Sequence, residues 1–139
     1  MKILRVFILM CMATIAYATA QGRTPGEKVG VKFESLSYDF GNVKEDAGKV
    51  VHEFVYTNIG DSPVSILRAK ASCGCTAPQY SRKPVMPGEK GSVTVTFRTA
   101  RQRGEQNKDV RLRFKNGNGK SEEITVHIVG VVLPPDKDK

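Results

Sequence analysis

The chain has 139 residues, of which 40% are hydrophobic and 26% are charged. Once a leader of twenty residues is set aside, the remaining length fits one domain and excludes a two-domain enzyme. The composition is ordinary for a globular domain and excludes an intrinsically disordered chain. The formal net charge is +8, and it falls to +6 if Lys2 and Arg5 leave with the leader. We therefore expect a basic mature protein.

Residues 1–20 have the three parts of a secretory signal peptide. Lys2 and Arg5 form a basic start, residues 6–17 form an apolar run, and Ala18-Thr19-Ala20 precede the expected cleavage site. The apolar run is shorter than the roughly 20 residues that cross a bilayer. We expect an exported protein, periplasmic or secreted, that does not span the membrane after cleavage; an uncleaved anchor is the alternative. In that compartment disulfides persist.

The mature chain reads as a series of short strands. Residues 21–30 are polar and rich in glycine, which indicates a flexible lead-in. From there to position 133, alternation of apolar and polar residues predicts strands, with Asn, Gly and Pro turns between them. The predicted strands are 31–34, 38–43, 49–58, 63–70, 91–99, 107–115 and 121–133. Residues 134–139 form a charged tail.

About seven strands without an intervening amphipathic helix predict an all-β fold. We expect residues 31–133 to form a single immunoglobulin-like antiparallel β-sandwich, with a small barrel as the alternative. The two cysteines of the mature chain are two positions apart, so neither can join one sheet to the other. The core must depend on packing, and the phenylalanines expected in it are Phe33, Phe40, Phe54, Phe97 and Phe114.

One segment, residues 71–90, departs from the strand pattern and contains Cys73 and Cys75. In extended chain their α-carbons would lie about 6.7 Å apart, at the limit for a disulfide, so a bond between them needs a bend that Gly74 can supply. Closing such a short loop removes little chain entropy, about 1 to 2 kcal/mol, so the bond would be a weak staple and easily reduced.

Three interpretations of this cysteine pair are open. The first is a structural disulfide or a quiet thiol pair. The second is a redox site, for which Lys70, Arg82 and Lys83 are nearby cations that would stabilise a thiolate. The third is a Cu(I) site, in which Met86 or His52 adds a soft or borderline ligand to the two sulfurs. Apart from Cu(I) in this third case, no cofactor is expected.

The C-terminal half is rich in arginine and lysine. Alternation places positions 111, 113 and 115 on one outward face of a strand. Such a face attracts anions, for example an acidic protein, an anionic glycan or a lipid surface, although a merely solvated sheet face has the same pattern. The candidate anion-binding residues are Arg98, Arg101, Arg103, Arg111, Arg113 and Lys115. Nucleic acid is not an expected partner, because exposed aromatic residues do not interleave with these cations.

The sequence predicts no enzyme. Ser72, His52, His127, Asp39 and Asp109 supply the residue types of a hydrolase triad. However, no serine lies in the glycine pattern of a nucleophile elbow. We therefore expect no catalytic residues.

The chain resembles the bacterial family called domain of unknown function 1573, secreted Ig-like domains common in Bacteroidota. The resemblance covers about residues 33–132. It rests on Phe40-Gly41-x-Val43, His52-x-Phe54, Asn58-x-Gly60, Ser72-Cys73-Gly74-Cys75-Thr76 with Pro78, Pro87-Gly88-x-x-Gly91 and Gly130. It implies a sandwich related to major-sperm-protein-like and hydin-type domains, with no established catalytic activity.

That motif also implies that Ser72, Gly74, Thr76 and Pro78 support the cysteine loop. The function expected from all these features is that of an exported, non-enzymatic module that binds or scaffolds envelope or extracellular partners. The alternative is a thiol-redox or Cu(I)-handling protein that acts through Cys73-Gly74-Cys75.

Overall fold

The computed structural model describes residues 22–136, and these residues form eight β-strands and one short 3-10 helix. The predicted leader, residues 1–20, lies outside the described residues. The elements are β1 (Val31–Phe33), β2 (Ser37–Lys44), η1 (Glu45–Ala47), β3 (Lys49–Asn58), β4 (Val64–Ala71), β5 (Thr76–Tyr80), β6 (Lys90–Arg98), β7 (Gly104–Asn116) and β8 (Ser121–Leu133).

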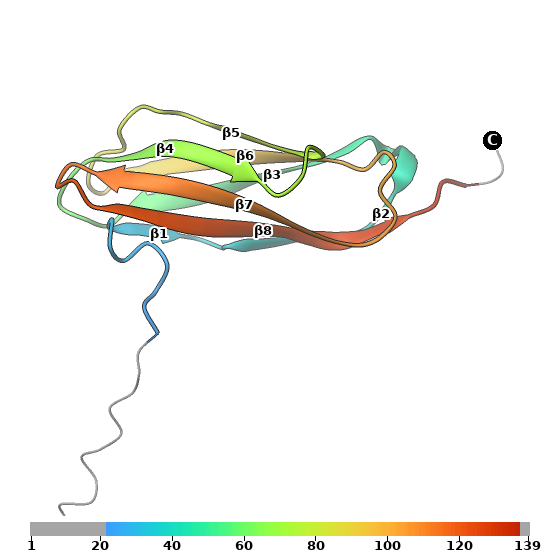
Figure 1. Cartoon of the computed structure of the whole chain (residues 1–139), viewed down its shortest axis with the longest axis horizontal. Helices are drawn as coiled ribbons and strands as arrows, with labels where there is room; N and C mark the ends of the chain where they lie inside the picture. The colour runs from blue at the N-terminus through green and yellow to red at the C-terminus, as the bar shows by residue number, and fades with distance from the viewer. Residues whose placement is uncertain (1–21, 137–139) are drawn as a thin grey trace, which may run out of the picture.

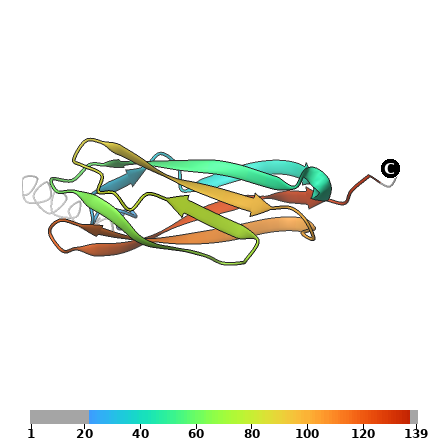
Figure 2. The same ribbon diagram turned by 90° about the horizontal axis from the view of Figure 1, so that it is seen from above.

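The strands form two four-stranded sheets packed face to face, which confirms the predicted immunoglobulin-like sandwich (Figure 1). One sheet, here called sheet A, has the order β1-β3-β6-β5, and the other, sheet B, has the order β2-β8-β7-β4. Seen from above, β4 and β5 run along the same side of the sandwich, although they belong to different sheets (Figure 2). The connection between them therefore crosses from sheet B to sheet A.

One strand pair departs from the predicted antiparallel arrangement. β2 pairs with β8 in parallel, whereas the other neighbours in both sheets are antiparallel. The reason is that the chain leaves β1 in sheet A and enters β2 in sheet B after only three residues. So short a link changes the sheet without reversing the direction of the chain. Alternation along a strand says nothing about the direction of its neighbour, and the sequence therefore missed this pair.

β2 contains a bulge at Phe40 and Gly41. Asp39 pairs with Val129 and Asn42 pairs with Val131, so two residues of β2 oppose Gly130 alone. Gly41 has a φ of 67°, and its amide donates to Oδ1 of Asp39 at 2.7 Å. The bulge lets the Phe40 ring stack against Phe97 of sheet A, with ring centroids 5.5 Å apart. It therefore joins the two sheets through an aromatic contact.

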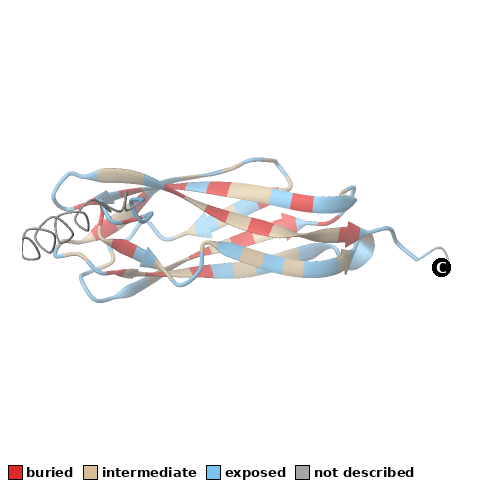
Figure 3. Ribbon diagram, turned by 90° about the horizontal axis from the view of Figure 1, so that it is seen from below, coloured by how far each residue is buried: buried red, intermediate tan, exposed pale blue. Residues whose placement is uncertain are grey.

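The core lies between the sheets and follows the alternation of the sequence (Figure 3). Phe54, Phe97 and Phe114 are fully buried, as predicted. Phe33 and Phe40 are only partly buried, because they come from β1 and β2, at one edge of each sheet. Valine, isoleucine and leucine side chains of β3, β4, β6, β7 and β8 fill the remaining interior.

The segment 71–90 is not one long loop, because it contains β5. This strand forms an edge of sheet A and pairs only with β6, through a register that runs from Thr76 opposite Phe97 to Tyr80 opposite Val93. Pro78 lies in the middle of it. A proline is tolerated in an edge strand, where a missing N–H breaks no inner ladder. The proline and the short length hide this strand from a search for alternation.

The predicted flexible lead-in is fastened to the sandwich over its last residues. Val29 is 1% exposed and belongs to the core. The backbone amides of Gly26 and Lys28 donate to the two carboxylate oxygens of Glu122 at 3.0 and 2.9 Å. Within the expected flexible lead-in, residues 21–30, the last part therefore contacts the sandwich. In the predicted tail, Asp136 forms an ion pair with Lys44, and residues 137–139 are not described.

Across residues 22–136, no helix is both long enough and apolar enough to cross a membrane.

Candidate functional site

Cys73 and Cys75 form a disulfide in the connection between β4 and β5. Their α-carbons lie 5.3 Å apart, closer than two positions of an extended strand allow. The chain bends at Gly74, where a Cβ would meet no other atom within 4 Å. The bend that the sequence required for this bond is therefore present. It lies at the crossover from sheet B to sheet A.

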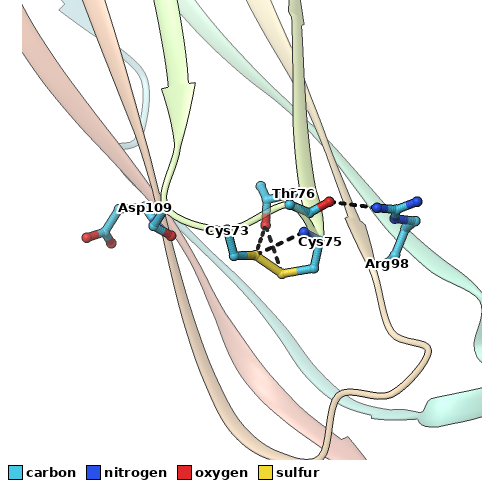
Figure 4. Close-up of a disulfide and its surroundings, with 7 residues drawn as sticks. Cys73, Cys75, Thr76, Arg98 and Asp109 are labelled. Carbon is cyan, nitrogen blue, oxygen red and sulfur yellow. Dashed lines mark hydrogen bonds between the residues drawn. A yellow bond between two sulfur atoms is a disulfide. The ribbon is translucent and has the colours of Figure 1, made fainter.

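Each side of the disulfide is attached to a different sheet (Figure 4). Before Cys73, the amide of Ser72 donates to the carbonyl of Asp109 in β7 at 2.8 Å, and the amide of Asp109 donates to the Ser72 hydroxyl at 3.1 Å. After the bond, the amide of Arg98 in β6 donates to the Cys75 carbonyl at 2.8 Å. Ser72, one of the expected supporting residues, therefore connects the incoming end of the loop to β7.

Polar groups surround the two sulfur atoms unequally. Sγ of Cys73 lies 3.2 Å from the donating amide of Cys75 and 3.5 Å from the Thr76 hydroxyl. Sγ of Cys75 has only the Thr76 hydroxyl, at 3.7 Å. Thr76 is 4% exposed and begins β5, so its hydroxyl is held in place by the strand. Thr76 thus holds the outgoing end of the loop, and Pro78, two residues later, lies opposite Val95 in the β5–β6 ladder.

The cation that hydrogen-bonds to the loop, Arg98, is not one of those that are near it in the sequence. Nη2 of Arg98 donates to the Gly74 carbonyl at 2.6 Å. Arg98 is 23 residues from Cys75 in the chain but reaches it through the β5–β6 ladder. Next to it, Cys75, Arg98, Ala100, Arg101 and Gln102 line a hollow of about 330 Å³. Because the register of β5 against β6 places this arginine, only knowledge of that strand could have revealed it.

The four residues of the predicted Cu(I) site do not come together. Met86 precedes the first residue of β6, next to Val85, whose amide donates to the Val64 carbonyl. Cys75 lies at the other end of β6, where its carbonyl accepts the amide of Arg98, the last residue of the strand. The nine residues of β6 separate them by about 27 Å. His52 lies in β3, two strands away from β5. Its ring stacks on Tyr38, with centroids 3.8 Å apart, and burial lowers the pKa of His52.

The residue types of a hydrolase triad are only partly assembled. Nδ1 of His127 lies 2.8 Å from Oδ1 of Asp109. Ser72, the serine considered in the sequence, uses its hydroxyl to accept the amide of Asp109. The Ser72 hydroxyl is therefore bonded to the backbone of Asp109 and not to the His127 imidazole. The contact between Asp109 and His127 joins β7 to β8, where the two residues lie opposite each other.

The second candidate site is a set of cations on the outer face of sheet B. Arg111, Arg113 and Lys115 alternate along β7 and are all exposed, as predicted. β4 adds two cations that were not in the predicted set, since Arg68 pairs with Arg113 and Lys70 pairs with Arg111. We call Arg68, Lys70, Arg111 and Arg113 the basic cluster. With Glu123 they line a hollow of about 210 Å³.

The other three predicted anion-binding residues lie elsewhere. Arg98 belongs to β6 in sheet A, and Arg101 and Arg103 lie between β6 and β7. Nε of Arg103 donates to Oε2 of Glu45 at 2.8 Å, and the Arg101 amide donates to Oε1 of the same residue at 3.0 Å. The hydrogen bond from Arg103 holds the pKa of Glu45 below its usual value. The structure thus divides the predicted set between two surfaces.

Comparison with solved structures gives sandwiches of the same kind. The chain is similar to the ASH/PapD-like domain 7 of human CEP192, at 12% identity and a TM-score of 0.62, covering 88% of this chain and 98% of that domain. It is also similar to the Vibrio cholerae VesB protease, at 20% identity and a TM-score of 0.61, and to WR4, a C. elegans MSP family member, at 10% identity and a TM-score of 0.51.

At these low identities, the similarities show only that the folds are alike. The match covers 73% of this chain but only 32% of the VesB chain, so the chain spans about a third of that protease. For WR4 the match covers 75% of this chain and 98% of that one, which agrees with the expected major-sperm-protein-like fold. No curated protein matches the sequence.

Residues 31–132 match the family described as "Protein of unknown function (DUF1573)". The matched range begins with β1 and ends in β8, so it takes in the whole sandwich and the cysteine loop. The chain belongs to the DUF1573 family.

Proposed function

We propose that this protein is an exported, non-enzymatic binding module that engages an anionic surface through the basic cluster on sheet B. The proposal keeps the sandwich as a rigid scaffold and assigns binding to side chains on one exposed face. The observation that carries it is the register of β4 against β7, which sets Arg68 opposite Arg113 and Lys70 opposite Arg111.

Like charges directly opposite each other weaken an antiparallel pair of strands, by about 0.2–1 kcal/mol. Two such pairs follow one another here. Among residues 22–136, no carboxylate oxygen lies within 4 Å of the charged nitrogens of the basic cluster. Glu123 lines the same hollow and pairs with Arg113 in the strand register, yet it forms no ion pair there. These like-charge pairs do not stabilise the fold, and a bound anion would reduce the repulsion between the cations.

The hollow between the four cations has the size and chemistry for a phosphate or carboxylate group. Its volume of about 210 Å³ exceeds that of a single such group, and each of the three guanidinium groups that line it has two parallel N–H donors to offer such an anion. Lys115 extends the positive face along β7. A row of cations on the outer face of a sheet suits many anions presented side by side, as on an anionic lipid or glycan surface of the envelope.

Vesicle binding tests the proposal. Full mature protein is mixed with vesicles of phosphatidylglycerol and phosphatidylcholine, or of phosphatidylcholine alone, and bound protein is measured by sedimentation. A sulfated glycan, heparin, is the second probe. We expect binding to at least one anionic probe, weakened by salt because exposed charges are screened beyond about 8 Å at physiological ionic strength. The double variant Arg111→Gln, Arg113→Gln should lose about tenfold or more in affinity.

A matched control removes the same charge from the other sheet. Lys32 and Lys49 are exposed on β1 and β3, so Lys32→Gln, Lys49→Gln lowers the net charge equally and leaves the basic cluster intact. This control should retain most of the affinity. Equal losses in the two double variants, or binding to neither anionic probe, would overturn the proposal. Circular dichroism and the unfolding midpoint check that both variants fold.

A further inference from the structure

The disulfide lies beside a second positively charged hollow, at a distance from the basic cluster and on the other sheet. We propose that Cys73–Cys75 is a thiol–disulfide exchange site at which a thiol carrying a carboxylate attacks Sγ of Cys75, and Cys73 leaves. This inference is independent of the anion-binding function, because it uses a different sheet, different residues and a covalent step. Three observations carry it.

The first observation is the access to Cys75. Of the two cysteines, Cys75 is the one that lines the hollow of about 330 Å³ with Arg98 and Arg101. Among the described residues, neither arginine has an ion-pair partner within 4 Å. Figure 4 shows Cys75 on the Arg98 side of the bond and Cys73 on the Asp109 side. An anionic thiol attracted into the hollow therefore meets Cys75 first.

The second observation is the unequal surroundings of the sulfurs. Cleavage leaves an electron pair on the departing sulfur, and hydrogen-bond donors aimed at that sulfur stabilise it as a thiolate. Sγ of Cys73 already has the Cys75 amide at 3.2 Å and the Thr76 hydroxyl at 3.5 Å. Sγ of Cys75 has the hydroxyl alone, at 3.7 Å. Because a better-stabilised thiolate leaves faster, Cys73 is the leaving group.

The third observation is that the loop is short but firmly held. The two cysteines are separated by a single residue, so the bond restricts the unfolded chain little and adds little to the stability of the fold. Meanwhile the hydrogen bonds of Ser72 to Asp109 and of Cys75 to Arg98 hold the two ends of the loop without it. Reduction can therefore occur while the sandwich stays folded, and the cysteines remain close enough to close again.

The reaction has two steps. A thiolate attacks Sγ of Cys75, the Cys73–Cys75 bond breaks, and its electron pair goes to Cys73, which leaves a mixed disulfide on Cys75. A second thiolate then attacks the outer sulfur of the mixed disulfide and releases Cys75. Two thiols are oxidised to one disulfide, and the protein takes up their two electrons and two protons. The exchange is stoichiometric, so the proposal requires no further oxidant.

The test compares a thiol that carries carboxylates, glutathione, with a neutral one, 2-mercaptoethanol. Each is mixed with oxidised protein, the released thiol is capped with iodoacetamide, and peptide mass spectrometry locates the mixed disulfide. We expect glutathione on Cys75 and the cap on Cys73. The reverse distribution, or a bond that millimolar glutathione leaves intact, would overturn the proposal.

Two pairs of variants test separately the role of the arginines in attracting the thiol and the role of Thr76 in stabilising the leaving thiolate. Arg98→Gln should slow the reaction with glutathione about threefold to tenfold more than the reaction with 2-mercaptoethanol. Lys32→Gln, at an exposed position of β1 on the opposite edge of sheet A, is the matched control and should change neither rate. Thr76→Val should slow both thiols, whereas Thr76→Ser keeps the hydroxyl and should restore the rate. Equal slowing of the two thiols by Arg98→Gln, or no effect of Thr76→Val, contradicts the proposed roles.

Discussion

The Phe40 ring lies directly against the backbone of Gly130, across the β2–β8 pair. A Cβ at position 130 would overlap Cδ2 and Cε2 of Phe40 and come within 2.8 Å of the Gly41 carbonyl oxygen. Gly130 also has a φ of 156°, at the edge of the range that side chains rarely adopt. The bulge, the glycine opposite it and the aromatic contact with Phe97 therefore form one structural unit.

Gly130→Ala should destabilise the protein by about 2–4 kcal/mol, because the new methyl group must displace the Phe40 ring or the strand. Urea unfolding measures this loss. In a Phe40→Ala background the ring is absent, so Gly130→Ala should cost distinctly less than in the native protein. Strictly additive losses in the double variant would show that the ring is not the source of the strain.

Asn58 should be the most sensitive polar residue of the core. It is fully buried, its amide nitrogen donates to the carbonyls of Ser62 and Val85 at 2.9 Å, and its oxygen accepts the amide of Gly60 at 2.9 Å. Asn58→Ala removes all three hydrogen bonds, and of the three backbone groups the Val85 carbonyl still accepts the Val64 amide, so the substitution should cost about 2–4 kcal/mol.

Asn58→Asp has nearly the same shape but no N–H, so it should destabilise at least as much as alanine does. Asn107→Ala, at an exposed position of β7, is the control and should change the free energy of unfolding by less than about 0.5 kcal/mol. A stability near that of the native protein for Asn58→Asp would mean that the donor contacts are unimportant.

Stability should fall below neutral pH because of His52. Burial against Tyr38 and Phe54 lowers the pKa of this imidazole, and the neighbouring Glu53 opposes the shift only in part. Because the folded pKa is lowered, the stabilisation is complete above the unfolded value, about 6.5, and is lost as pH falls through the folded pKa.

The His52→Phe variant keeps a ring between Tyr38 and Phe54 but cannot take up a proton. Its unfolding midpoint should therefore decrease less than that of the native protein between pH 7 and pH 5. Nuclear magnetic resonance of the imidazole gives the pKa directly. A value above that of histidine in a peptide would contradict the predicted direction.

Loss of the disulfide should leave the fold intact. The double variant Cys73→Ser, Cys75→Ser removes a bond that closes a loop of three residues, so it should lower the free energy of unfolding by only about 1–2 kcal/mol. Thermal unfolding followed by circular dichroism measures the change. A loss above about 4 kcal/mol would show that the bond is a main structural support, as in disulfide-dependent domains.

Much of the fold follows from local patterns. Alternation at Val93, Val95 and Phe97 predicts a half-buried strand, and these residues are fully buried in β6. The same reasoning missed β5, because Pro78 and a length of five residues leave no alternation to detect. It also missed the parallel β2–β8 pair, since the direction of a neighbouring strand depends on the path of the whole chain.

The candidate sites show the same division. Alternation along β7 was enough to place Arg111 and Arg113 on one exposed face, because side chains of a strand point to opposite sides in turn. Spacing was also enough to show that a bond between Cys73 and Cys75 needs a bend. By contrast, the contact of Arg98 with Gly74 and the pairing of Arg68 with Arg113 join residues 24 and 45 positions apart. Such neighbours are set by the register between strands, which only the folded chain defines.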